Sequence, residues 1–363
     1  MKVTMLGRSD AGKTTYMAAM YAVMNGQHQS RRGFGVIAAN GGDHESLLRL
    51  GQRITREGDY PSATDVRGEY AFSLTLNGSV VLPFTWVDHR GGALYESTGA
   101  ASQLDTLLAD LRDSDAILVF LDAPTLVHDA DGNADIGRLA AVLGNLLGER
   151  LPPPIAFVVS KADVLLPAPE TPPSAVPVTI LFAIAVALTF FATDSTGLLL
   201  ATIGGWAAGL VALYLRAATI GEQSKRRQAA LRTVIERAAV PLDGLIGAIH
   251  ASTELQGGLI ATGCSRHEMI NVDKPMLFAL RFGIETRVAR LRALIADLES
   301  NAGYYESRSS LWDSLRSTFS GVTSNAKHAR LMREKAATEH GRVVQLQPAA
   351  ESLRPRIRDF ILF

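Results

Sequence analysis

The chain has 363 residues, with 36 basic and 36 acidic side chains and 47% hydrophobic residues. Its length allows one large domain or roughly two to three smaller ones, and its balanced charge excludes the basic signature of a nucleic-acid-binding protein. Cys264 is the single cysteine, so an internal disulfide is excluded and a reducing compartment fits. The first residues already have the pattern of a strand, so we expect no cleaved signal peptide.

The first predicted elements surround a phosphate-binding loop. Residues 7–14 read Gly-Arg-Ser-Asp-Ala-Gly-Lys-Thr, between a strand-like run at 3–6 and a helix-like run at 15–24. In this context, backbone N–H groups and the positive end of the helix dipole face phosphate oxygens. We expect Lys13 to reach the β- and γ-phosphates and Thr14 to ligate Mg²⁺. The candidate nucleotide-binding residues here are Asp10, Ala11, Gly12, Lys13, Thr14 and Thr15.

The next elements alternate between strands and helices. An antiparallel pair of strands, 70–76 and 79–87, is predicted on either side of an Asn77–Gly78 hairpin turn. The elements that follow are predicted at 103–111 (helix), 116–122 (strand), 133–149 (helix) and 154–159 (strand). Apolar strands that alternate with helices predict an α/β fold, with a mostly parallel sheet and helices on both faces.

Polar residues follow two of these later strands. Asp88 can hold Mg²⁺, directly or through water, and the backbone N–H of Gly91 can meet a γ-phosphate. At 160–163 the sequence reads Ser-Lys-Ala-Asp. The Asp163 carboxylate can accept from N1–H and the 2-amino group of guanine, and the Lys161 stem can lie over the ring. Because ligands gather beyond the carboxyl ends of such strands, we expect one site with Ser160, Lys161 and Asp163 at the base.

With these motifs in this order and spacing, the chain resembles the P-loop GTPases of the translation-factor and Ras-like class. The motifs are the loop at 7–14, the Asp-x-x-Gly at 88–91 and the Ser-Lys-Ala-Asp at 160–163. Within that class the chain looks most like the bacterial double-GTPase domains of GTPase-associated conflict systems. The likeness covers about residues 1–163 and 256–285.

This resemblance implies further site residues. The Tyr-Pro-Ser-Ala-Thr at 60–64 is similar to the family's Pro-x-x-Thr switch, in which Thr64 closes on Mg²⁺ and the γ-phosphate. Residues 258–265 look like the last strand and its base-contacting loop, which includes Cys264, and 271–280 resembles the closing helix. The resemblance assigns catalysis to Lys13, Thr64 and Gly91, and the metal to Thr14, Thr64 and Asp88.

The chain departs from this family at one catalytic position. Many GTPases follow the Asp-x-x-Gly with a Gln, His or Glu that orients the attacking water, whereas this chain has Gly92. His89 and Arg90 lie inside the motif instead, where a side chain either positions water, stabilises charge or points outward. We expect slow intrinsic turnover that needs a partner's arginine or a second copy of the chain.

After Asp163 the composition changes. A Pro-rich linker at 166–175 leads to two charge-free runs, 176–193 and 197–215, each about as long as the hydrocarbon core of a bilayer is thick. Basic residues follow the second run and are missing from the loop between the runs, which predicts that both ends face the cytoplasm. We expect a transmembrane helical hairpin at 176–216, in the inner (cytoplasmic) membrane. The alternative is a buried αα-hairpin between soluble domains.

The predicted domain organisation follows from these segments. The parts are a first GTPase part at 1–165, the linker at 166–175, the transmembrane hairpin at 176–216, a helical connector at 217–257, the last strand and closing helix of the GTPase domain at 258–285, and a helical C-terminal region with a tail at 286–363. The fold class expected is therefore a P-loop GTPase with an inserted membrane hairpin and a helical C-terminal region.

The expected function is that of a membrane-anchored, nucleotide-dependent switch that hydrolyses GTP to GDP and phosphate. Its cofactor is Mg²⁺, and its partners are GTP and GDP, the bilayer and a protein effector, with no nucleic acid. Two other functions stay open: a non-hydrolysing nucleotide-gated scaffold, and an ATPase in which Ser160 to Asp163 only cap a loop. Effector, pathway and oligomeric state do not follow from the sequence.

Overall fold

The structure is a computed structural model that describes residues 1–25, 34–61, 67–89, 101–128, 131–147, 152–166, 222–244, 246, 257–265, 269–309 and 324–353. The chain divides into two compact units, one of residues 1–164 with 235–363 and the other of residues 165–234. In the second unit, the described residues are 165–166 and the helical residues 222–234. The sheet, the helices around it and the candidate site belong to the first unit.

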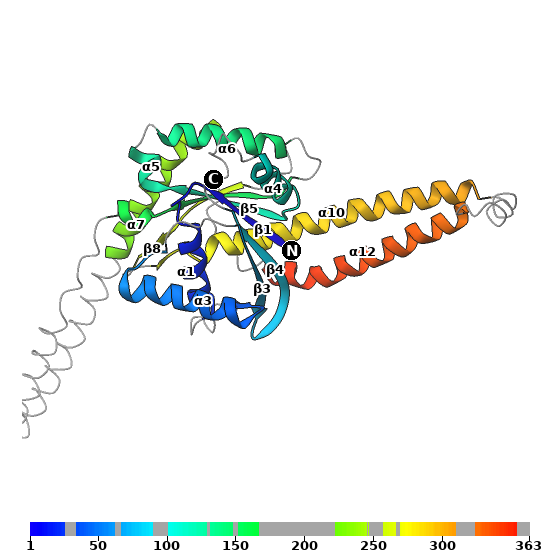
Figure 1. The fold of residues 1–363 in the computed structure, drawn as a ribbon, viewed down its shortest axis with the longest axis horizontal. Coiled ribbons are helices and arrows are strands. Elements are labelled where there is room, and N and C mark those ends of the chain that lie inside the picture. The colour runs from blue at the N-terminus through cyan, green and yellow to red at the C-terminus, as the bar shows by residue number, and fades with distance from the viewer. Residues whose placement is uncertain are drawn as a thin grey trace, which may run out of the picture. The chain divides into compact units, whose positions relative to one another are not determined.

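A seven-stranded sheet forms the centre of the first unit, in the order β2-β3-β4-β1-β5-β6-β7 (Figure 1). Its strands are β1 Lys2–Gly7, β2 Phe34–Ala38, β3 Gly68–Leu76, β4 Ser79–Asp88, β5 Ala116–Asp122, β6 Ile155–Ser160 and β7 Gly257–Ala261. The neighbouring strands β4, β1, β5, β6 and β7 are all parallel to one another. Strand β3 is antiparallel to both of its neighbours, β2 and β4. Two short strands, β8 Gly263–Cys264 and β9 Met269–Ile270, pair with each other.

Helices cover both faces of this sheet. Their bounds are α1 Lys13–Asn25, α3 Gly41–Gln52, α4 Ala101–Arg112, α5 Ala123–His128, α6 Asp131–Leu147, α7 Ala162–Leu165, α10 Lys274–Ser307 and α12 Asn325–Leu353, with a short π-helical turn, η1, at Arg53–Glu57. Alternate residues of β5 point to opposite faces. Leu118 and Phe120 pack in the core that α1 and α10 share, and Ile117 and Val119 are buried on the other face, where Figure 1 shows α4 and α6. The α/β architecture with a mostly parallel sheet agrees with the prediction.

The predicted transmembrane hairpin is corrected by the structure. Within the described part of the chain, no helix is long and apolar enough to cross a membrane. The two long helices, α10 and α12, carry charged side chains along their length, whereas a span needs about 20 predominantly apolar residues. The expected hairpin at 176–216 lies outside the described residues. The fold class is therefore α/β with a helical C-terminal region, and the inner-membrane, multi-pass location is not retained.

The helical C-terminal region contains a long antiparallel pair, α10 and α12. The first turns of α10 are buried against the sheet, from Pro275 to Ile284. Along α12 the buried side chains Ala329, Ala336 and Val343 recur every seven residues, which is the spacing that keeps one face of a helix toward a partner helix. The last turn of α12 buries Leu353 in the same core as β1 and β4. Both ends of this pair are thus attached to the sheet.

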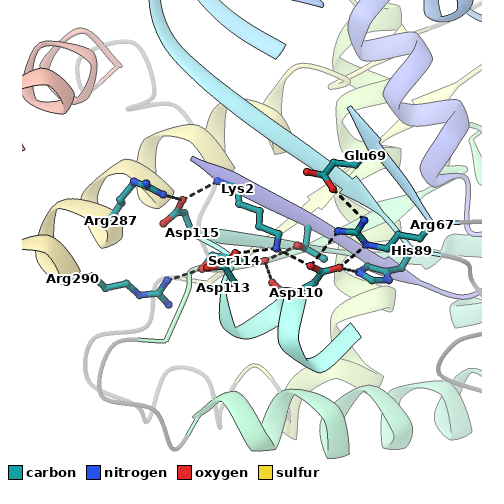
Figure 2. A network of polar contacts seen from close by, with 11 residues as sticks. Lys2, Arg67, Glu69, His89, Asp110, Asp113, Ser114, Asp115, Arg287 and Arg290 are labelled. Atoms are coloured by element: carbon teal, nitrogen blue, oxygen red, sulfur yellow. Dashed lines mark hydrogen bonds and ion pairs between the residues drawn. The ribbon is translucent and has the colours of Figure 1, made fainter. Parts of the chain in front are cut away.

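Charged residues that are far apart in sequence contact one another next to the start of β1 (Figure 2). Asp110 of α4 accepts from Lys2 Nζ at 2.7 Å and from Arg67 Nε at 2.8 Å, and its carboxylate lies 2.9 Å from His89 Nε2. Asp110 is 8% exposed. A buried carboxylate with three cationic or polar partners holds three chain segments against α4.

A second branch of this network reaches α10. The backbone N–H of Lys2 and the guanidinium of Arg287 both donate to Asp115 Oδ2, each at 2.8 Å. Arg290 donates to the carbonyl oxygen of Ser114 at 2.8 Å, and the Ser114 hydroxyl lies 2.6 Å from that of Thr4. The turn after α4 therefore links β1 to the part of α10 that follows its buried first turns.

The network predicts a specific acid sensitivity. Burial raises the pKa of Asp110, but the hydrogen bonds from Arg67 and Lys2 outweigh burial and lower that pKa to about 2. Since the folded pKa lies below the unfolded value, the stabilisation is present above about pH 4 and is lost as the pH falls through about 2. Asp110→Asn should lower the free energy of unfolding at neutral pH by about 2 kcal/mol. Urea unfolding from neutral to acid pH should show this difference shrinking at the acid end.

The matched control is Asp113→Asn, because the Asp113 side chain is 77% exposed and contacts Lys2 alone among these cations. Its unfolding free energy should stay close to that of the wild type. A difference between Asp110→Asn and wild type that persists unchanged at the acid end would contradict the assignment.

Candidate functional site

The phosphate-binding loop connects the carboxyl end of β1 to α1. Gly7 has a φ of 153°, and a Cβ there would lie 2.6 Å from the carbonyl oxygen of Phe120 in β5. Only glycine fits so close to a neighbouring strand. Asp10 and Gly12 have positive φ values of 63° and 79°, which fold the loop back over the start of α1. This shape turns backbone N–H groups toward one side, as phosphate binding requires.

Lys13 lies across this loop. Its Nζ donates to the carbonyl oxygens of Gly7 and Arg8, both at 3.1 Å, and the residue is only 6% exposed. Burial lowers the pKa of Lys13, against the opposing effect of the Asp88 and Asp10 carboxylates. A buried ammonium held by two neutral carbonyls gains much from a bound anion, because the anion replaces part of the lost solvation.

Thr14 and Asp88 form the second part of the site. The parallel register of β1 with β4 places Asp88 beside Met5, and the Thr14 hydroxyl donates to Asp88 Oδ2 at 3.1 Å. Asp88 is 1% exposed, and burial raises its pKa. Among the described residues, Asp88 Oδ1 is buried and has no hydrogen-bond partner. A hydroxyl and a carboxylate oxygen are hard ligands, so the pair fits Mg²⁺, which binds through few protein oxygens together with phosphate and water.

Ser160 lies at the carboxyl end of β6 and supports the loop. Its hydroxyl is within hydrogen-bonding distance of the carbonyl oxygens of Ala11, at 2.7 Å, and Leu121, at 3.0 Å. It therefore connects the phosphate-binding loop to β5 and β6. The sequence placed Ser160 at the base; in the structure its hydroxyl contacts backbone on the phosphate side.

Lys161 is held by an acid that the sequence did not single out. It has a positive φ of 55°, and its Nζ forms an ion pair with Asp122, the last residue of β5. The register of β5 with β6 sets Asp122 beside Ser160. The Lys161 stem is thereby fixed along the cavity that it lines. The position of Asp122 at the end of a buried strand was the sequence signal that could have identified it.

Asp163 and Cys264 meet where α7 approaches β8. The backbone N–H of Ala162 donates to the carbonyl oxygen of Thr262 at 3.0 Å, which brings the two segments together. A Cβ at Gly263 would lie 2.7 Å from Asp163 Oδ1, so glycine is needed for this approach. Burial, together with the negative charge of Asp163, raises the pKa of Cys264 to about 12. The thiol therefore stays neutral at physiological pH.

One cavity of about 390 Å³ brings these residues together. It contains most of the predicted nucleotide-binding residues and adds Ser9, Tyr16, Tyr60, Pro61, Val164 and Thr262. Its lining is Ser9, Asp10, Gly12, Lys13, Thr14, Thr15, Tyr16, Tyr60, Pro61, Ser160, Lys161, Asp163, Val164, Thr262 and Cys264. Asp88 contacts Thr14 beside it. Thr64 and Gly91, predicted to be catalytic, lie outside the described residues.

His89 turns away from this cavity. It follows Asp88 directly, and successive residues of an extended chain point to opposite sides. Asp88 faces Thr14, whereas His89 is 5% exposed and lies against Asp110 in the network of Figure 2. Burial lowers the pKa of His89, against the effect of Asp110. In this conformation the His89 ring does not reach a water at the phosphate end.

Comparisons with known proteins add little. No protein-family model matches the chain, and no curated protein matches its sequence. Among solved structures, the chain is similar to the mammalian SRP receptor, with 10% identity over 77% of this chain and 98% of that one, at a TM-score of 0.36. It is also similar to a mutant NFeoB from S. thermophilus bound to GDP, with 11% identity over 70% of this chain and 98% of that one, at a TM-score of 0.23. Likenesses this weak carry no argument, so function is inferred from the site.

The approach of Gly263 to Asp163 makes a first prediction about binding. Gly263→Ala should displace the Asp163 carboxylate and weaken binding of guanine nucleotides by about tenfold. Fluorescent-nucleotide titration measures this directly. The control is Gly144→Ala in α6, where a Cβ meets nothing within 4 Å. Equal affinities for the two variants would show that Asp163 does not depend on this contact.

Tyr60 makes a second prediction. Tyr60 lines the cavity and is 49% exposed. Burial, followed by electrostatic interactions with Asp163 and Cys264, raises the pKa of its hydroxyl, so Tyr60 lies near the residues expected at the base. An aromatic face contributes about 1–3 kcal/mol when a base stacks on it. Tyr60→Ala should therefore weaken nucleotide binding at least about tenfold, and Tyr60→Phe should not. If both variants lose affinity equally, the hydroxyl rather than the ring makes the contact.

Proposed function

We propose that this chain binds GTP with Mg²⁺, hydrolyses it slowly to GDP and phosphate, and acts as a nucleotide-dependent switch. One observation carries the proposal: a single cavity is lined by the phosphate-binding loop, by Thr14, whose hydroxyl contacts Asp88 beside the cavity, and by Ser160, Lys161 and Asp163. A nucleoside triphosphate needs these three parts in this order, from its phosphates to its base. The protein effector that reads the switch is part of the proposal.

At the phosphate end, the loop N–H groups and Lys13 bind the β- and γ-phosphates. The buried Lys13 ammonium exchanges carbonyl contacts for phosphate oxygens, and its charge then opposes the negative charge that builds up as the bond to the γ-phosphate breaks. Thr14 and Asp88 would hold Mg²⁺, which supplies charge neutralisation across the β- and γ-phosphates. Asp88 Oδ1, which is buried and has no hydrogen-bond partner among the described residues, is open to a cation that would offset the cost of burying this carboxylate.

At the base end, the proposal assigns guanine selection to Asp163. A carboxylate accepts two hydrogen bonds from N1–H and the 2-amino group of guanine, and adenine offers neither donor at these positions. Lys161, fixed by Asp122, lines the same part of the cavity. Thr64 and Gly91 remain proposed as the groups that meet Mg²⁺ and the γ-phosphate.

Slow turnover is supported by the direction of His89. A general base must reach the attacking water, and the His89 ring lies against Asp110 instead. We therefore infer that a partner supplies part of the catalytic machinery.

The experiment compares binding of GTP, ATP and xanthosine triphosphate with Mg²⁺ to wild type, Asp163→Asn and Lys13→Met. Wild type should prefer GTP to ATP by about a hundredfold or more, because adenine would leave the Asp163 carboxylate without the two donors that guanine supplies. Asp163→Asn replaces one acceptor oxygen with an N–H₂ donor, which matches the 2-oxo group of xanthine, so the preference should move to xanthosine triphosphate. Lys13→Met should bind all three nucleotides poorly.

Asp113→Asn provides the matched control, since it makes the same substitution at an exposed acid remote from the cavity. Equal affinity of wild type for GTP and ATP, unchanged in Asp163→Asn, would instead favour an ATPase. Multiple-turnover phosphate release then separates a GTPase from a non-hydrolysing scaffold.

A further inference from the structure

The open end of the β3–β4 hairpin lies at the proposed metal ligand. The last pair in its register joins Gly68 to Asp88. Arg67 precedes Gly68 and His89 follows Asp88, so these two residues are the next on each strand beyond that pair. Open hairpin ends fray unless something holds them. Besides the pairing of Asp88 with Met5 of β1, the position of the Asp88 carboxylate therefore depends on what holds Arg67 and His89.

One carboxylate, Asp110, contacts both of these residues. Arg67 donates to it through two nitrogens, Nε to Oδ2 at 2.8 Å and a terminal guanidinium nitrogen to Oδ1 at 3.3 Å. His89 Nε2 lies 2.9 Å from Oδ2, at ion-pair distance but with poor hydrogen-bond geometry. Figure 2 shows Arg67, His89 and Lys2 converging on Asp110. The two residues that flank the hairpin end thus share one buried anion.

The Asp110 carboxylate is itself held in place by neighbouring residues. Asp110 is on α4, its backbone carbonyl accepts from the Ser114 hydroxyl at 2.6 Å, and Lys2 Nζ donates to Oδ1 at 2.7 Å. Lys2 is the first residue of β1, the strand that leads into the phosphate-binding loop. Asp110 is consequently in contact with β1, which leads into the loop before Thr14, and with His89, which directly follows Asp88 at the end of β4.

We propose that Asp110 is a positioning residue for metal binding: by holding Arg67 and His89 together, it keeps Asp88 aimed at Thr14. This inference rests on the proposed function, since it concerns the Mg²⁺ that accompanies the nucleotide. Asp110 touches neither nucleotide nor metal. Its effect passes through the backbone of β4, from His89 to the adjacent Asp88.

The test measures Mg²⁺ affinity separately from nucleotide affinity. Asp110→Asn should weaken Mg²⁺ binding to the protein–GDP complex by about tenfold, the scale on which supporting contacts act on metal ligands. Affinity for GDP in excess chelator should not change, because the loop and base contacts remain. Mn²⁺ bound to the complex, followed by electron paramagnetic resonance, gives an independent spectroscopic readout of the same loss.

Three comparisons make the outcome decisive. Asp113→Asn, which contacts Lys2 and neither Arg67 nor His89, should leave Mg²⁺ affinity at the wild-type value. In the double variant, the loss of Mg²⁺ affinity should be smaller than the sum of the losses caused by Asp110→Asn and by Thr14→Ala, because both substitutions disturb the position of Asp88. If Asp110→Asn folds poorly, Arg67→Met removes one partner and should show a smaller loss in the same direction.

Amide hydrogen exchange tests, without any ligand, whether Asp110 holds the open end of the β3–β4 hairpin. Asp110→Asn should exchange faster than Asp113→Asn in peptides that contain Gly68 and Asp88. If Asp110→Asn loses only unfolding free energy, with Mg²⁺ affinity and local exchange unchanged, the positioning role is overturned. If wild type binds no nucleotide but Asp110→Asn still accelerates exchange at Asp88, the proposed function fails while the structural half of this inference stands.

Discussion

The candidate site depends on the parallel packing of β1 between β4 and β5. On one side, the register of Met5 with Asp88 brings a carboxylate to the start of α1. On the other, Gly7 packs against the Phe120 carbonyl so closely that no side chain fits. Since both contacts are made at the carboxyl end of β1, the phosphate-binding loop receives its shape and its acid from two neighbouring strands. A shift of register between β1 and β4 would separate Thr14 from Asp88, and one between β1 and β5 would disrupt the close fit of Gly7 against Phe120.

Two buried carboxylates of this unit, Asp110 and Asp88, differ in how fully their partners compensate the charge. Asp110 has Lys2, Arg67 and His89 around it, and its pKa is lowered. Asp88 has the Thr14 hydroxyl and one oxygen without a hydrogen-bond partner in the described residues, and its pKa is raised. A fully compensated carboxylate stabilises a structure, whereas a partly compensated one carries a cost that a bound cation relieves. Adjacent residues, Asp88 and His89, connect the two.

Local patterns in the sequence predicted much of this arrangement. The loop at 7–14, the Asn77–Gly78 hairpin and the apolar strands each depend on neighbouring residues, so a linear pattern records them. Asp122 and Asp110 were missed because their roles come from pairing with residues 39 and 43 positions away along the chain. The α10–α12 pairing was missed because its repeat on α12 is made of two alanines and one valine, which leaves no strongly apolar stripe. The membrane prediction relied on hydropathy, on the length of two charge-free runs and on the flanking charges, in a segment outside the described residues.

The residues that line the cavity and the residues that hold its strands in place belong to different parts of the chain. Most residues that line the cavity come from the segments after β1, β6 and β7, together with Tyr60 and Pro61. The start of β1 is held by Asp110 of α4 and by Asp115, which also accepts from Arg287 of α10, and none of these three residues lines the cavity. Arg287 and Arg290 reach the turn after α4 from the α10 side, and Lys2 reaches it from β1. A partner that altered the α10–α12 pair would therefore act on the strands of the site by two routes. One runs through Asp115 and Ser114 to Lys2 and β1, and the other through the first turns of α10, which pack against the sheet. The charged contacts at the turn after α4 give the effector of the proposed switch a defined place to act.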